Sequence, residues 1–126
     1  MNPDEAYEFF TNSLTRKENL IIKEGKGGLS YYKNGVFVCH FNAKPRKDRD
    51  DLGFADFRYD ALRPYLDTDS TISAIRKDAL PEVKIKSHKL WCSLHFPLSK
   101  LEHIADLFLK HIISEVSTSS QQEKNL

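Results

Sequence analysis

The sequence predicts an α+β fold: a twisted antiparallel sheet of about five strands, with an N-terminal and a C-terminal helix packed on one face. Two amphipathic stretches, over residues 3–15 and from residue 99 onward, have apolar side chains at helical spacing. Between them, β-branched and aromatic segments alternate with Gly, Asn and Pro turn signals. Strands that tight turns join pair antiparallel, which favours a sheet of this kind.

The first helix is predicted over residues 3–15. Asn2 is a suitable N-cap, Pro3 follows at the first helical position, and Glu5 completes a capping box three residues after the cap. An apolar stripe then recurs at helical spacing, comprising Ala6, Phe9, Phe10 and Leu14.

Three strands are predicted next, over residues 20–23, 29–33 and 36–42. A glycine-rich stretch at 25–28 separates the first two, and Asn34-Gly35 joins the second and third. Asn and Gly tolerate the positive φ that a type I′ turn requires, so this dipeptide predicts a tight hairpin. Side chains of the third strand alternate, which predicts that Phe37, Cys39 and Phe41 form its core face.

The middle of the chain is predicted to hold shorter elements. Residues 44–53 form a polar loop, 54–57 a short strand and 60–66 a helical turn. Asp69 or Ser70 is expected to cap a short helix that Pro81 terminates.

The C-terminal part is predicted to add two strands and the last helix. In residues 82–87, Val83 and Ile85 point inward while Lys84 and Lys86 point outward. A second strand covers 90–96, and the pair Ser99 and Glu102 forms a capping box for the final helix. Residues 117–126 have no apolar period and are expected to be a disordered tail, which leaves 1–116 as a single domain.

Composition narrows the class of protein. The chain has 126 residues and a net charge of +1, so any attraction for nucleic acid must come from a local patch. No apolar run approaches the ~18 residues of a membrane span, and no leader peptide is recognised, so we expect a cytoplasmic protein without a membrane partner. Cys39 and Cys92 lie in apolar segments and are expected to be buried free thiols.

The segment KLWCSLHFPLSKLEHIADLFLKHI, at residues 89–112, resembles the end of the small YdhG-like domains, with a strand, a Phe-Pro-Leu junction and a long helix. The hairpin at 29–41 and the segment 54–66 are similar to earlier parts of the same domains. MmcQ/YjbR-type proteins share this frataxin-like plan. The resemblance spans about residues 20–115 and implies a frataxin-like fold, with a small ligand or iron as an alternative to a macromolecular partner. It carries no catalytic motif to this chain.

One enzymatic alternative is a metal-dependent phosphodiesterase or nuclease built on Asp69, Glu82 and Lys84. Such enzymes need converging carboxylates to hold a metal ion and a lysine beside the attacking water. The same residues also fit a half-buried strand with a charged outer face. No complete catalytic set is otherwise present in the sequence, and no catalytic residue is predicted.

A metal site from Cys39, His40, Cys92 and His95 has a suitable ligand set for zinc. Within each strand, however, the cysteine and the histidine point to opposite faces. We therefore predict no metal ligands and no cofactor.

Basic residues form two clusters that suit phosphate binding. The predicted binding residues are Lys44, Arg46, Lys47 and Arg49 in the polar loop, with Lys84, Lys86, His88, Lys89 and Trp91 near the fifth strand. Tyr31 and Phe57 are expected to offer stacking faces beside them. Basic side chains interleaved with aromatic ones are typical of single-stranded nucleic-acid surfaces. The leading hypothesis is therefore a non-catalytic binding or adaptor domain for nucleic acid, a phosphorylated ligand or a protein.

Overall fold

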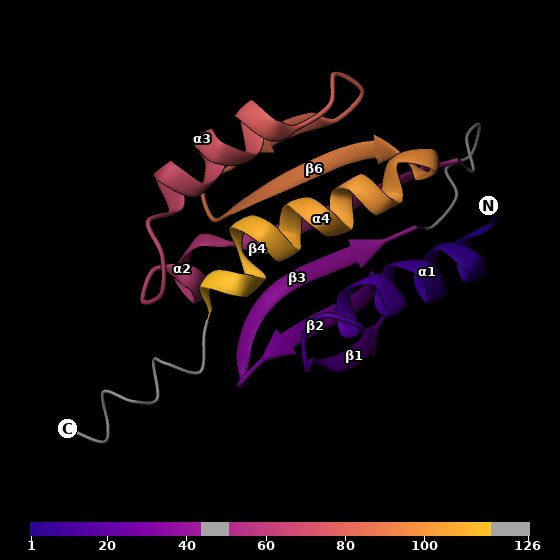
Figure 1. The fold of residues 1–126 in the computed structure, drawn as a ribbon, viewed down its shortest axis with the longest axis horizontal. Coiled ribbons are helices and arrows are strands. Elements are labelled where there is room, and N and C mark those ends of the chain that lie inside the picture. The colour runs from indigo at the N-terminus through magenta and orange to yellow at the C-terminus, as the bar shows by residue number, and fades with distance from the viewer. Residues whose placement is uncertain (44–50, 117–126) are drawn as a thin grey trace.

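The computed structural model describes residues 1–43 and 51–116, which form an open antiparallel sheet covered by helices (Figure 1). The described strands are β1 (Ile21–Gly25), β2 (Gly28–Lys33), β3 (Val36–Asn42), β4 (Leu52–Arg58), β5 (Lys84–Ser87) and β6 (Trp91–Pro97). Their order across the sheet is β1-β2-β3-β4-β6-β5, and every neighbouring pair is antiparallel. The predicted basic loop at 44–49 and the predicted disordered tail at 117–126 lie outside the described residues.

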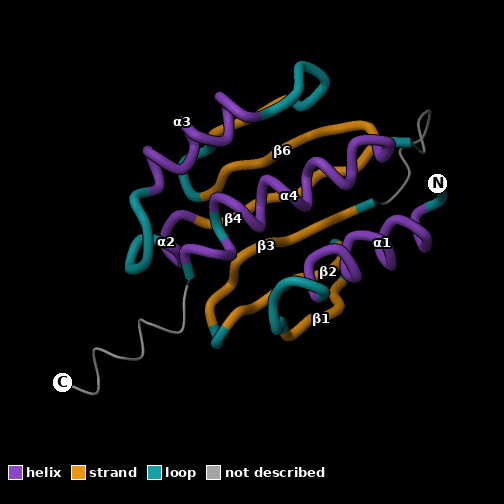
Figure 2. Tube along the Cα trace, viewed as in Figure 1, coloured by secondary structure: helices purple, strands orange, loops and turns teal. Residues whose placement is uncertain are grey.

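The helices lie on one face of the sheet. They are α1 (Pro3–Thr15), α2 (Tyr59–Leu62), α3 (Thr68–Asp78) and α4 (Leu101–His111), with short 3-10 turns at Leu98–Lys100 and Ile113–Glu115. Figure 2 shows α1, α3 and α4 on the same side of the strands, with α4 crossing the middle of the sheet. The predicted α+β fold is confirmed, with six described strands where about five were expected. Each of the six corresponds to a predicted strand segment, and the short segments predicted at 20–23 and 54–57 are the longer strands Ile21–Gly25 and Leu52–Arg58.

Two local predictions are confirmed in detail. The backbone N–H of Glu5 donates to the Asn2 side chain (2.8 Å), and the backbone N–H of Asn2 donates to the Glu5 carboxylate (2.9 Å). This capping box begins α1 at Pro3, and the helix ends at Thr15 as expected. At the β2–β3 turn, Asn34 and Gly35 have φ values of 52° and 82°, the left-handed backbone that a type I′ hairpin requires.

Two predicted helix starts are wrong. Asp67 caps α3, because its carboxylate accepts hydrogen bonds from the backbone N–H groups of Asp69 (3.0 Å) and Ser70 (3.3 Å). Ser99 does not cap the final helix, since it lies in the 3-10 turn and α4 begins at Leu101 without a side-chain cap. There the backbone N–H of Leu101 donates to the carbonyl oxygen of Leu98, so the 3-10 turn leads directly into the helix.

The core fills the space between the helices and the sheet. Fully buried aromatic side chains from both layers meet there: Phe10, Tyr31, Phe41, Phe57 and Phe108. Helices α1 and α4 contact each other across this core. At the far end of β2, the buried ammonium of Lys33 donates to the carbonyl oxygen of Ile113 (2.9 Å), beyond the end of α4.

Cys39 and Cys92 are free and buried, as predicted. Burial raises the pKa of both thiols, to about 11 for Cys92. Neither sulfur is therefore a thiolate near neutral pH. Among the helices described, none is long and apolar enough to cross a membrane.

Candidate functional site on the open face of the sheet

The face of the sheet that points away from the helices, called here the open face, carries the candidate site. Successive side chains of a strand point to opposite faces, and β4 follows this rule. Ala55 and Phe57 are fully buried on the helix side, whereas Phe54, Asp56 and Arg58 are partly exposed on the open face. The same alternation in β3, β5 and β6 places a set of polar and aromatic side chains beside them.

Cross-strand pairing arranges these side chains in rows. Asn42, Phe54, His95 and Lys84 stand directly opposite one another on β3, β4, β6 and β5, and are called here the Phe54 row. Side chains in directly opposite positions are close enough to contact each other. The row therefore joins an amide, a benzene ring, an imidazole and an ammonium group across four strands.

A second row lies two residues farther along the strands. It comprises His40, Asp56, Ser93 and Lys86 on the same four strands, and is called here the Asp56 row. Each row ends in a lysine on the edge strand β5. The two rows together place one benzene ring, two imidazoles, one carboxylate and two ammonium groups on this face, while Asn42 and Ser93 are buried.

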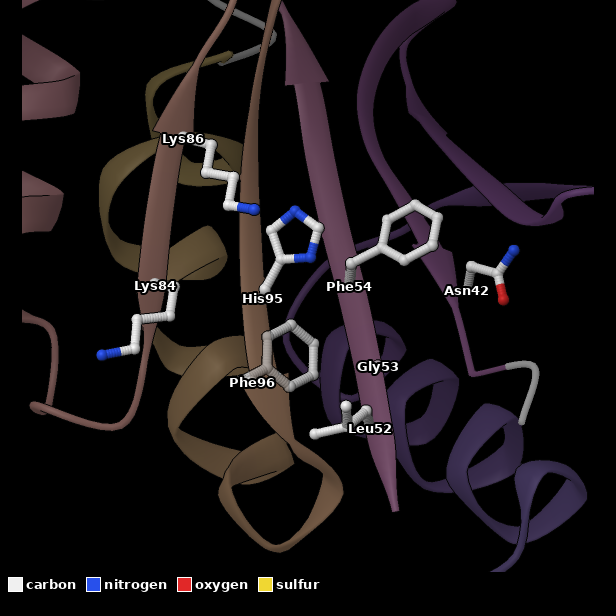
Figure 3. A pocket seen from close by; sticks show the side chains of 8 residues that line it. All are labelled: Asn42, Leu52, Gly53, Phe54, Lys84, Lys86, His95 and Phe96. Atoms are coloured by element: carbon white, nitrogen blue, oxygen red, sulfur yellow. The ribbon is translucent and has the colours of Figure 1, made fainter. Parts of the chain in front are cut away.

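Phe54 lies between two histidines. Its ring centroid is 5.7 Å from that of His95, with 27° between the ring planes, and 6.0 Å from that of His40. Figure 3 shows the rings of Phe54 and His95 side by side, with their faces toward the viewer and the helices behind the sheet. The side chain of Lys86 points toward His95, while that of Lys84 extends away from it.

A shallow hollow of about 220 Å³ lies over the Phe54 row. Its lining residues are Asn42, Leu52, Gly53, Phe54, Lys84, Lys86, His95 and Phe96. Ligand pockets that enclose a whole small molecule usually measure about 300–1,000 Å³. This hollow is smaller, so it suits one ring of a ligand whose remainder lies on the open face.

His40 connects the open face to the β1–β2 turn. Its Nδ1 lies 3.5 Å from an Asp56 carboxylate oxygen, and the ring also hydrogen-bonds the backbone of Gly27. The Asn42 amide donates to the carbonyl oxygen of Gly27 at 2.6 Å. Hydrogen bonding to Asp56, opposed by partial burial, raises the pKa of His40 above its usual 6.5. The imidazolium form thus offsets the Asp56 charge and holds the turn against the sheet.

This arrangement predicts a pH-dependent stability. Because the folded state raises the pKa of His40, its contribution is complete below pH 6.5 and is lost as the pH rises through the folded value. The free energy of unfolding is expected to fall over this window, by at most ~1.4 kcal/mol per pH unit for one proton. Urea denaturation at several pH values measures this change in the free energy of unfolding. His40→Gln should remove this component and His88→Gln should keep it; a His40→Gln profile that matches the parent would contradict the assignment.

Trp91 lies at the other end of the open face. Its side chain is 38% exposed, it stands opposite Arg58, and its ring centroid is 5.3 Å from that of His88. Arg58 is 3.4 Å from the carboxylate of Asp60. A second exposed aromatic ring thus lies among basic groups on the same face as Phe54.

Of the two predicted clusters of binding residues, the structure describes only the second. Lys84, Lys86 and Trp91 lie on the open face, His88 contacts Trp91, and Lys89 is exposed in the β5–β6 turn. The structure thus brings the second predicted cluster together. The first cluster, comprising Lys44, Arg46, Lys47 and Arg49, lies outside the described residues.

The predicted stacking residues are wrong. Tyr31 and Phe57 are fully buried on the helix side of the sheet, where no ligand base can reach them. Phe54 and His95, both partly exposed, occupy the aromatic positions on the open face instead. The period-two alternation of residues 52–58 was the signal that could have identified Phe54, three positions from Phe57 and therefore on the opposite face.

The structure does not bring together the carboxylates of the nuclease alternative. Asp69 lies in the first turn of α3, and Glu82 follows the end of that helix. Asp69 and the last residue of α3, Asp78, are nine positions apart, which is about 13 Å at ~1.5 Å per residue, against the ~5 Å over which two carboxylates share an ion. Glu82 instead lies 3.7 Å from Lys100, while Lys84 lies on the open face.

The cysteines and histidines of the strands are separated by the sheet. Cys39 and Cys92 are buried on the helix side, whereas His40 and His95 lie on the open face. Across residues 1–43 and 51–116, no group of three or more His, Cys, Asp or Glu side chains is placed to hold a metal ion.

The chain matches no family model, and neither a curated protein nor a solved structure is significantly similar to it. The resemblance to YdhG-like and frataxin-like domains stays a prediction.

Proposed function

We propose that this chain is a non-catalytic nucleic-acid-binding domain and that the open face of its sheet is the binding surface. The observation that carries the proposal is Phe54, partly exposed between two imidazoles in a row that ends in Lys84. Exposed aromatic rings bordered by cations on a sheet are a recurring way to bind bases and phosphates together.

The charge distribution supports this proposal. The whole chain has a net charge of only +1, yet the open face places Lys84 and Lys86 along one edge, while Arg58 at one end lies 3.4 Å from the Asp60 carboxylate. Asp56, a carboxylate on the same surface, has His40 beside it. The local field thus favours an anionic ligand even though the overall charge is small.

The test is binding of fluorescein-labelled single-stranded and duplex oligonucleotides, measured by anisotropy at several salt concentrations. Binding to at least one of them should weaken as salt increases, because lysines that neutralise phosphates release counterions. The double variant Lys84→Ser, Lys86→Ser should lower the magnitude of the log–log salt slope by about 1.4, at ~0.7 per phosphate contact with a single strand.

The matched control is the double variant Lys17→Ser, Lys77→Ser, which removes the same charge from exposed positions after α1 and on α3. Its salt slope should equal that of the parent protein. The proposal is wrong if no salt-dependent binding occurs, or if both double variants change the slope equally.

A further inference from the structure

We infer that the open face takes unpaired nucleotides, with one base stacked on Phe54 and a second on Trp91. This inference rests on the proposed function and names its substrate class as single-stranded nucleic acid. It depends on three features of the described residues: the partly exposed ring of Phe54 with the exposed ring of Trp91, their separation, and two lysines on the edge strand, Lys84 level with Phe54 and Lys86 between the two rings.

The first platform is the pair of rings from Phe54 and His95. Their centroids are 5.7 Å apart and the ring planes are inclined by 27°, so the two rings form one aromatic cluster on the open face (Figure 3). Every base has a π-face and can stack on such rings. The hollow of about 220 Å³ above these rings has room for a ring system, while its small volume leaves the rest of the ligand outside.

The second platform is Trp91, which is paired with Arg58, four residues along β4 from Phe54. At ~3.3 Å per residue, the two platforms are about 13 Å apart along the strands. Lys84 and Lys86 follow the same direction on β5, at the edge of the sheet. A nucleotide chain running along β6 would therefore place its phosphates near these lysines and its bases over the two platforms.

This geometry favours single strands over duplexes. In a duplex the faces of the bases are covered by their neighbours, so a base must be unpaired or extruded before it can stack on a protein ring. A sheet surface presents rings rather than an element that enters a groove. Duplex molecules can reach the lysines alone, and they should bind more weakly.

Trp91 is the single tryptophan of the chain, so its fluorescence reports directly on the second platform. Titration with a short single strand of thymidines or uridines is expected to quench this fluorescence, and an equimolar duplex is expected to quench it much less. Deoxyribose and ribose strands should bind within a few fold of each other, because neither stacking nor phosphate contact reads the 2′-hydroxyl.

Phe54→Leu tests the first platform, because leucine keeps an apolar side chain but offers no π-face. Single-strand affinity should fall by about 5- to 150-fold, the equivalent of ~1–3 kcal/mol for one stacked base, while the salt slope stays unchanged. The matched control is Phe9→Leu, a half-buried phenylalanine of α1 on the opposite side of the sheet, which should bind like the parent.

The outcomes separate the inference from the proposed function. Salt-dependent binding that prefers duplex, or that survives Phe54→Leu without quenching Trp91, would retain a nucleic-acid surface and overturn the stacking mode. Absence of binding to both ligands at low salt would overturn both. A ribose strand bound far more tightly than its deoxyribose counterpart would show that the 2′-hydroxyl is read and contradict a site built on stacking alone.

Discussion

Gly28→Ala is expected to destabilise the protein by at least ~3 kcal/mol. Gly28 has a φ of +121°, a backbone conformation that L side chains rarely adopt and that costs about 1–3 kcal/mol for other residues. A Cβ at this position would also overlap the backbone oxygen of Phe41. Because Phe41 lies in β3 and its ring is fully buried, the strand cannot move aside without disturbing the core.

Gly35→Ala is the matched control for this change. Gly35 also has a positive φ, +82°, but a Cβ added there meets no atom within 4 Å. Its substitution should therefore cost only the left-handed backbone conformation, about 1–2 kcal/mol. Urea denaturation measures the free energy of unfolding of both variants. An equal decrease at the two glycines would show that the close approach of Gly28 to Phe41 does not contribute to the destabilisation.

Phe57→Ala is expected to cost about 3–5 kcal/mol of folding free energy, the usual range for removing a fully buried aromatic side chain. The Phe57 ring is inaccessible to solvent and makes edge-to-face contacts with Tyr59 and Phe108, at centroid distances of 6.0 and 6.2 Å. Its removal would leave a cavity between β4 and α4. The shift of the urea denaturation midpoint measures this loss of folding free energy.

Phe54→Ala provides the contrast on the same strand. Phe54 is only partly buried on the open face, so its removal should destabilise the fold by less than half as much as Phe57→Ala. If the proposed function holds, it should nevertheless be the variant that loses ligand affinity. A larger stability loss at Phe54 than at Phe57 would reverse the assignment of the two faces.

Local sequence signals predicted the local structure well. The capping box of Asn2 and Glu5 and the turn at Asn34-Gly35 depend only on residues within a few positions of each other, and both were predicted correctly. The start of α4 was predicted wrongly, because a capping motif at Ser99 competes with a 3-10 turn whose backbone bonds are equally local. The motif alone does not distinguish these two ways of beginning a helix.

The candidate site depends on strand order, which local signals do not contain. Phe54, His40 and His95 come together only because β4 pairs with β3 on one side and with β6 on the other. The sequence indicated the outward direction of Lys84 and Lys86 but not which strand would lie beside them. A shift of the β4 register by one residue would have moved Phe54 to the core face. The Phe54 row therefore depends on the pairing of several strands and cannot be predicted from one segment.

The contact between α1 and α4, together with the bond from Lys33 to Ile113, has a consequence for how the chain acquires its structure. These contacts join residues that are about 80–100 positions apart, so the loop-closure entropy is lost before the core can form. On a ribosome, the strands emerge before α4, and the part of their apolar face that α4 covers, at Phe57 for example, stays uncovered until that helix is complete. The domain should therefore fold late and in one cooperative step, and truncation within α4 should leave an aggregation-prone chain.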